Sequence, residues 1–319
     1  MAGAVESDLL IAKSPHPSPA RAALAWAPWA VLYLATFVVF LVASLSSHDA
    51  FWPRQVWGEA DGTSEYCEPL HADSGVMEPV NAWSNFATYG LLGTVVCALG
   101  TADALRLRNA DAGFFGERLR DSPMLSLLCG LSWLLLGVGS FFFHASHVEA
   151  WHVMDVGFTM AAVACMAGVS LVQLLLLHRA ESASRRAWLT IGTSALVVLL
   201  DAVLIANQRS LNHTAVLVGL AGMLVVLEGL VQPLLHGKSR EQWAFSSAAM
   251  LALLFGWCMR TLETSWGRPL CVHSSWFQPH SIWHATTALA IALQVHAWRL
   301  PFPATASRAE LPPVCRNAK

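Results

Sequence analysis

The chain has 319 residues, of which 55% are hydrophobic and only 13% are charged, and its formal net charge is −2. An ordinary soluble domain carries about 25% charged residues, so this composition indicates a membrane protein. The sequence contains no basic stripe of the kind that follows a phosphate backbone, and we therefore expect no nucleic-acid partner.

Apolar runs occupy most of the chain, and eight of them approach or exceed the ~20 residues that a membrane-spanning helix requires. We predict spans at residues 24–46, 82–105, 122–146, 153–177, 187–206, 213–235, 243–262 and 279–299. The predicted fold class is an all-α membrane protein. Its parts are a disordered tail at 1–22, a first transmembrane helix within 23–46, an acidic loop at 47–80, a seven-helix bundle over 81–300 and a second tail at 301–319.

The distribution of Lys and Arg predicts an orientation. Most of the nineteen basic residues fall in the two tails and in the loops on one side of the predicted bundle. The positive-inside rule then places both termini in the cytoplasm and the acidic loop 47–80 outside. We therefore expect an integral multi-pass membrane protein. The sequence does not indicate an oligomeric state.

Polar side chains from three predicted spans converge at the extracytoplasmic rim. His280 and His284 are four residues apart at the start of the last span and share a helix face, as do Ser140 and His144 at the end of the third span. Asp155 follows after a turn that we expect to be about six residues long, in the first turn of the next helix. Ionisable groups inside a membrane are costly and mark function.

Three histidines and a carboxylate are the chemistry of a catalytic zinc site. We expect His144, His280 and His284 to bind the ion, Asp155 to act as general base and Ser140 to stabilise an oxyanion. Each residue alone has a simpler interpretation: Ser140 as a packing residue, Asp155 as a helix cap. His147 and His152 could also reach a metal, but we expect them to be solvated.

The same residues resemble a known family. The strings Gly139-Ser140-Phe141-Phe142-Phe143-His144, Asp155 and His280-Ser281-Ile282-Trp283-His284, with an upstream Glu78-x2-Asn81-x2-Ser84-Asn85, resemble the alkaline ceramidases. These belong to a wider group of seven-helix membrane hydrolases that includes the adiponectin receptors. The resemblance covers about residues 62–300. It implies a zinc-dependent amidohydrolase that cleaves ceramide or a related N-acyl sphingolipid to a sphingoid base and a fatty acid. The span within 23–46 is additional to the family's seven helices.

The resemblance also implies a calcium site before the first shared helix. Its ligands here would be carboxylates of Glu65, Glu68 and Glu78 and the Tyr66 carbonyl. Leu70 replaces an Asn of the family pattern, and the spacing to Glu78 is one residue short. Both departures weaken the calcium interpretation, and an acidic solvated loop is the alternative.

The seven cysteines include two, Cys67 and Cys271, in predicted outer loops near the site. An oxidising compartment would permit a disulfide between them. Three other functional classes remain open at this point. The first is a membrane electron-transfer protein, in which facing histidines such as His144 and His284 hold haem. The second is a seven-helix receptor in which hydrolysis is secondary. The third is a serine intramembrane protease, whose nucleophile turn Gly137-Val138-Gly139-Ser140 weakly resembles.

Overall fold

The structure is a computed structural model of the full chain. It describes residues 19–47, 52, 66–71, 73–107, 119–179, 183–207, 210–264, 270–272 and 275–300. Both expected tails lie almost wholly outside the described residues, as do Glu65 and most of the acidic loop.

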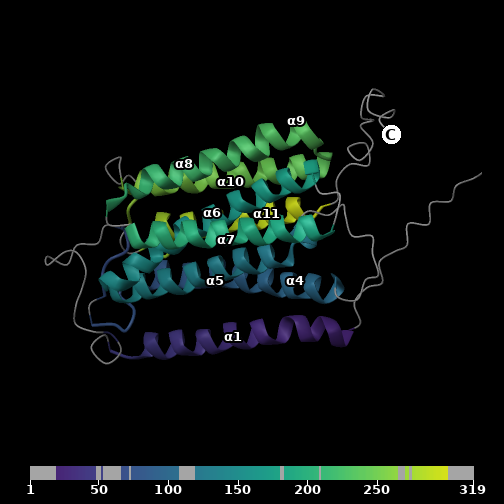
Figure 1. Cartoon of the computed structure of the whole chain (residues 1–319). Helices are drawn as coiled ribbons and strands as arrows, with labels where there is room; N and C mark the ends of the chain where they lie inside the picture. Colours follow the sequence, from purple (N-terminus) through teal and green to yellow (C-terminus); the bar gives the residue numbers. More distant parts are fainter. Residues whose placement is uncertain are drawn as a thin grey trace, which may run out of the picture.

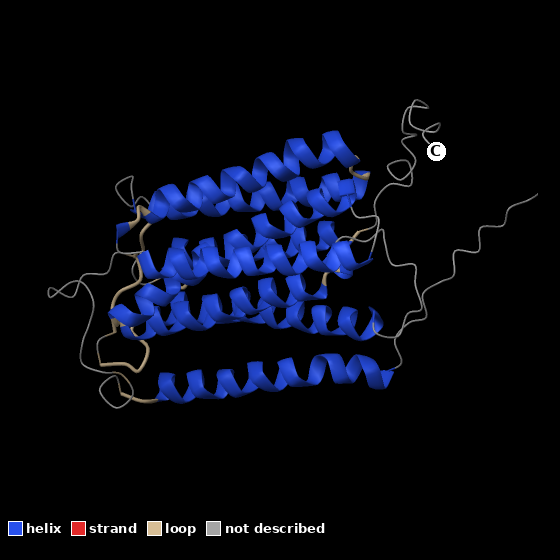
Figure 2. Cartoon of the chain, in the orientation of Figure 1, coloured by secondary structure: helices blue, strands red, loops and turns tan. Residues whose placement is uncertain are grey.

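The described chain is helical, and its long helices lie roughly parallel and antiparallel to one another (Figures 1 and 2). Their bounds are α1 Pro19–Leu45, α3 Pro79–Asn85, η1 Phe86–Gly90, α4 Leu91–Leu107, η2 Leu119–Asp121, α5 Pro123–Ser146, α6 Glu149–Arg179, α7 Ala183–Asn207, α8 His213–Val226, η4 Leu227–Val231, α9 Gln232–His236, α10 Arg240–Thr264 and α11 Pro279–Arg299. The π-helical turns η1 and η4 each join two α-helical pieces into one rod, α3–α4 and α8–α9.

Seven helices of the described chain are long and apolar enough to cross a membrane. They cover Ala20–Leu45, Pro79–Arg106, Pro123–Ser146, Glu149–Leu175, Trp188–Asn207, His213–Leu234 and Arg240–Glu263. These match seven of the eight spans expected from the sequence. The eighth, α11, is present as a helix of 21 residues but is outside this set. Imidazole, hydroxyl and amide side chains interrupt its apolar sequence, and it packs along α10 and contacts α3 inside the bundle.

The first helix, α1, packs at the edge of the bundle against α4 (Figure 1). Phe40 is fully buried there and stacks on Phe141 of α5 with ring centroids 3.7 Å apart. Tyr33 stacks on Phe86 at 4.5 Å, and the Trp29 indole donates a hydrogen bond to Thr101 Oγ1. Helix α1 therefore packs on the bundle through one face, which includes Trp29, Tyr33 and Phe40.

Several chain segments meet at one end of the bundle, which we call the site end. There α1 and α5 end, α6 and α11 begin, and the loop before α3 contacts the end of α5. The amide of Met77 donates to the carbonyl of Ala145, and the amide of Glu78 donates to the carbonyl of His144, each at 3.0 Å. These two bonds fix the start of α3 against the end of α5.

The connection between α5 and α6 corrects a sequence-based expectation. The turn is two residues long, His147 and Val148, where we expected about six. His147 caps α5 in the left-handed conformation, with φ 51°, and its amide donates to Phe143, so the chain reverses at once. Because α6 already begins at Glu149, Asp155 lies in its second turn. It neither occupies the first turn nor caps the helix.

Candidate metal centre

Three histidines from two helices meet at the site end. His144 lies in the last turn of α5, and His280 and His284 lie one turn apart at the start of α11. One ligand atom of each ring lies within 4.8 Å of those of the other two. All three side chains are buried, His144 completely. The sequence-based expectation that these residues come together is confirmed. The site could hold a metal ion.

The ring of His144 is held by a carboxylate from the start of α3. His144 Nδ1 lies 2.6 Å from Glu78 Oε2, and His147 Nε2 lies 3.3 Å from Glu78 Oε1. Burial raises the pKa of the Glu78 carboxyl, but the hydrogen bonds from His144 and His147 outweigh it and hold this pKa below its usual range. An ionised carboxylate only accepts, so His144 Nδ1 carries the proton that joins them.

The ring of His284 is held by the hydroxyl group of Ser84, which acts as the hydrogen-bond acceptor. Ser84 Oγ lies 2.9 Å from His284 Nδ1 and donates its own proton to the carbonyl of Asn81 at 2.8 Å. A hydroxyl has a single proton to donate, so Ser84 accepts from His284 Nδ1. Asn85 Nδ2 lies 3.3 Å from the opposite ring nitrogen, Nε2.

The third ring, His280, lies between a carboxylate and an aromatic ring. Its Nδ1 is 3.4 Å from Oε2 of Glu263, a fully buried residue at the end of α10. The Tyr66 ring packs on it with centroids 4.1 Å apart. The contact with Glu263 is longer than a usual hydrogen bond, and both side chains are buried.

The donor arrangement fits a metal ion. Nδ1 of His144 and Nδ1 of His284 each lie within hydrogen-bond distance of an oxygen, which leaves Nε2 as the ligand atom of these two rings. His280 Nδ1 is buried 3.4 Å from Glu263 Oε2 and has no hydrogen-bond partner among the described residues. His144 Nε2 is buried and has no hydrogen-bond partner among the described residues. Buried polar atoms of this kind normally have a partner, and a cation is the partner that three imidazole lone pairs would share. Three imidazoles with an open fourth position suit catalytic zinc.

Comparison of the sequence with models of protein families and with curated proteins gives no match. The assignment of the site therefore depends on its own geometry.

The two residues expected to act on substrate lie on the helices before and after the short turn, α5 and α6. Ser140 is buried one helical turn before His144 on α5. Asp155 is half-buried on α6, and its carboxylate is not a member of the three-residue metal-ligand group. Whether Asp155 and Ser140 reach a bound substrate stays a prediction.

The residues expected to bind calcium have other partners in the structure. Both Glu68 oxygens accept backbone amides at the start of α3, from Val80 and Asn81, each at 2.7 Å. Burial raises the pKa of Glu68 to about 7, although these amides lower it. Glu78 holds His144, Tyr66 packs on His280, and Glu65 lies outside the described residues. Calcium binding by this group stays a prediction.

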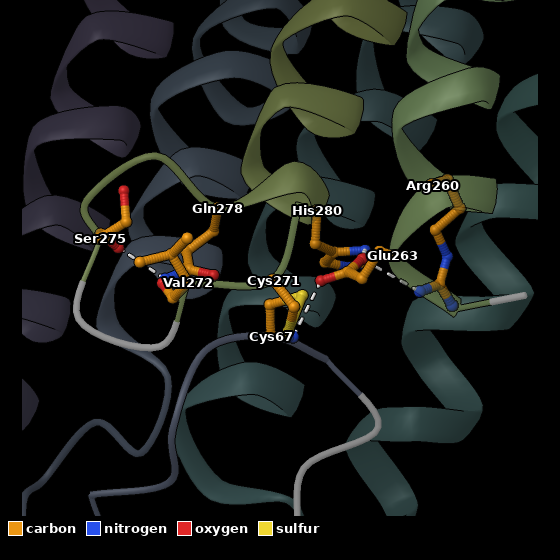
Figure 3. The surroundings of a disulfide bond; sticks show 8 residues. All are labelled: Cys67, Arg260, Glu263, Cys271, Val272, Ser275, Gln278 and His280. Atoms are coloured by element: carbon orange, nitrogen blue, oxygen red, sulfur yellow. Dashed lines mark hydrogen bonds and ion pairs between the residues drawn. A yellow bond between two sulfur atoms is a disulfide. The ribbon is translucent and has the colours of Figure 1, made fainter. Parts of the chain in front are cut away.

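The sulfur atoms of Cys67 and Cys271 lie at disulfide-bonding distance, with their Cα atoms 5.1 Å apart, as the sequence analysis expected (Figure 3). The bond joins the segment before α3 to the segment that leads into α11. Both segments lie over the histidines at the site end.

Two features of the centre were not expected from the sequence. Glu263 had no expected role, although an acidic residue one turn after Arg260 at the end of an apolar helix was a visible signal. His147 was expected to be solvated, whereas this side chain is buried and faces Glu78. The short turn explains the difference, since it turns His147 inward under the loop before α3.

Proposed function

We propose that the protein is an intramembrane zinc-dependent amidohydrolase that cleaves ceramide or a related N-acyl sphingolipid to a sphingoid base and a fatty acid. One observation carries the proposal: three buried imidazoles converge from two helices, with one ligand atom of each within 4.8 Å of the others. The resemblance of the surrounding strings to the alkaline ceramidases supplies the reaction and the substrate class.

Zinc held by His144, His280 and His284 would polarise the substrate carbonyl and lower the pKa of a water molecule towards ~7. Asp155 takes the proton from that attacking water and returns it to the leaving amine, which departs as the sphingoid base. Ser140 donates a hydrogen bond to the carbonyl oxygen as negative charge develops on it. The position of the centre among apolar helices suits a lipid amide whose chains lie in the membrane.

The orientation of the chain forms part of the proposal. The described helices suggest a multi-pass membrane protein. Loop charges favour cytoplasmic termini, and the site end would then lie near the extracytoplasmic face.

A haem site is less favoured than a metal ion because a third imidazole occupies the space that a macrocycle would need. The ring centroids of His144 lie 5.0 Å from His280 and 5.6 Å from His284, and those of His280 and His284 are 4.3 Å apart. A porphyrin between His144 and His284 would have to displace His280.

The test combines metal analysis with a hydrolysis assay on protein purified in detergent. We expect about one zinc per chain, no Soret absorbance, and release of fatty acid from a panel of N-acyl lipids. His144→Ala, His280→Ala and His284→Ala should each lose both zinc and hydrolysis. The control is His296→Ala, which removes an exposed imidazole from the same helix, α11. Full hydrolysis by a folded His284→Ala protein contradicts the proposal.

A further inference from the structure

We infer that Glu263 is a positioning residue of the metal centre, and that the Cys67–Cys271 disulfide keeps its carboxylate in place against His280. The thiol–disulfide state of this cysteine pair then sets the affinity of the centre for metal. The inference deepens the proposed function and rests on it for the identity of the metal. It starts from the contacts of one buried carboxylate.

Glu263 connects three separate segments of the chain (Figure 3). Its Oε1 accepts a hydrogen bond from the backbone amide of Cys67 at 3.0 Å. Its Oε2 lies 3.4 Å from His280 Nδ1 and 3.4 Å from Arg260 Nη1. The side chain has no exposed surface. One oxygen thus faces the disulfide-bonded residue while the other faces a metal ligand.

The neighbouring residue, Tyr66, links the same segment to the histidines directly. Its ring centroid lies 4.1 Å from that of His280 and 5.0 Å from that of His144. The Arg260 guanidinium lies 4.9 Å from the centre of the Tyr66 ring. Residues 66 and 67 therefore touch His280 both through the aromatic ring and through Glu263.

The disulfide is the covalent restraint on this segment. It joins residues that are 204 positions apart in the chain. On the Cys271 side, Gln278 Nε2 donates to the carbonyls of Val272 and Ser275, which fixes the path from Cys271 into the start of α11. The bond therefore ties residues 66–67, which lie outside any helix, to the segment that leads into α11.

Opening the bond follows ordinary thiol–disulfide chemistry. A dithiol reductant supplies two electrons and two protons, the S–S bond breaks, two thiols form, and the reductant becomes a disulfide. The covalent restraint on Cys67 is then lost, and we expect the hydrogen bond from its amide to Glu263 Oε1 to weaken. Outer-sphere partners of a metal-binding histidine typically contribute 10–100-fold to metal affinity, and we expect a loss in that range.

The experiment measures metal binding apart from activity, on the full chain in detergent. Zinc affinity is measured by competition with a chromophoric chelator, and the coordination geometry is followed by the visible spectrum of the Co²⁺-loaded protein. Glu263→Gln and Cys67→Ser/Cys271→Ser should each weaken zinc binding 10–100-fold and alter the cobalt bands. Combining them should cost little more than either alone, because both act through one contact.

Two matched variants control for general damage. Glu228→Gln removes a buried carboxylate that pairs with Lys238 at 2.8 Å, far along the helices from the histidines, and Cys258→Ser removes an exposed free cysteine of α10. Both should leave zinc affinity and the cobalt spectrum unchanged. If the disulfide variant does not fold, a phosphine reductant applied to folded wild-type protein gives the same comparison.

The outcomes separate this inference from the proposed function. Wild-type protein that binds zinc while Glu263→Gln and the reduced protein bind it equally tightly overturns the role of Glu263 and the disulfide alone. Wild-type protein without a zinc site overturns the proposed function. Strictly additive losses in the combined variant also contradict the inference, since they would mean that the two changes act separately.

Discussion

His144 and Glu78 form a buried pair at the site end, with Nδ1 2.6 Å from Oε2 and no exposed surface on either side chain. His144 lies in α5, Glu78 precedes α3, and the two residues are 66 positions apart. Glu78 belongs to the same short segment whose amides bond to the end of α5, so the backbone and the side chain fix the same position. The first expected metal ligand is therefore set by the junction between α3 and α5.

The first prediction concerns this carboxylate. Glu78→Gln keeps the volume but removes the charge that holds the Nδ1 proton of His144, so the ring loses its preferred tautomer and orientation. We expect zinc affinity to fall 10–100-fold. Chelator competition measures the change, and Glu241→Gln in the exposed first turn of α10 is the control. Wild-type affinity in Glu78→Gln would show that His144 needs no acceptor.

The second prediction separates metal binding from proton transfer. Asp155 lies outside the metal-ligand group, so Asp155→Asn should retain one zinc per chain. A general base contributes about 10²–10⁴-fold, and we expect kcat for amide hydrolysis to fall within that range with little change in KM. Loss of zinc from Asp155→Asn would instead make the residue a ligand or a support of one.

The third prediction concerns pH. Burial raises the pKa of Glu68 in the folded protein to about 7 from an ordinary value of 4.5. Between these pH values the folded state binds more protons than the unfolded state. The contribution of Glu68 to the free energy of unfolding is therefore fully present below pH ~4.5 and is lost as the pH rises towards 7. The melting temperature of wild-type protein should therefore fall more steeply from pH 5 to pH 7 than that of Glu68→Gln.

Glutamine at position 68 keeps one oxygen to accept an amide at the start of α3, so the cap is partly retained. Parallel pH dependence of the two melting temperatures would show that Glu68 titrates as an ordinary exposed carboxyl group. The comparison is made with zinc in excess, so that loss of the ion does not add its own pH dependence.

Much of the centre could be expected from the sequence because its geometry depends on helix periodicity. His280 and His284 share a face at a spacing of four, and the ends of α5 and α11 meet once the helices alternate in direction. The helices themselves follow from apolar runs whose length matches a membrane. The polarity of α11 was equally visible, since the residues that make it functional also lower its apolar content.

The remainder depends on contacts between residues that are distant in the sequence. Glu263 approaches His280 only because α10 and α11 pack closely and because Cys67 arrives from the other end of the chain. The left-handed turn at His147 could not be expected, since a residue other than glycine rarely adopts a positive φ. Ser84 accepts a hydrogen bond from His284 because its own proton is donated to the carbonyl of Asn81, and no sequence pattern predicts this contact.

The last prediction tests whether α1 is part of the folded bundle. Phe40 is fully buried, stacks on Phe141 at 3.7 Å and contacts Phe86 and Phe142 edge-on, so Phe40→Ala would leave a cavity among three aromatic rings. Truncation of a buried Phe costs about 3–5 kcal/mol in soluble proteins, and the loss of packing contacts remains in a membrane. We expect a melting temperature lower by several degrees in detergent. Leu41→Ala, at the neighbouring position with 40% of its surface exposed, should change it little. Equal melting temperatures for the two variants would mean that α1 is only an anchor, and that the bundle from α3 onwards is stable without it.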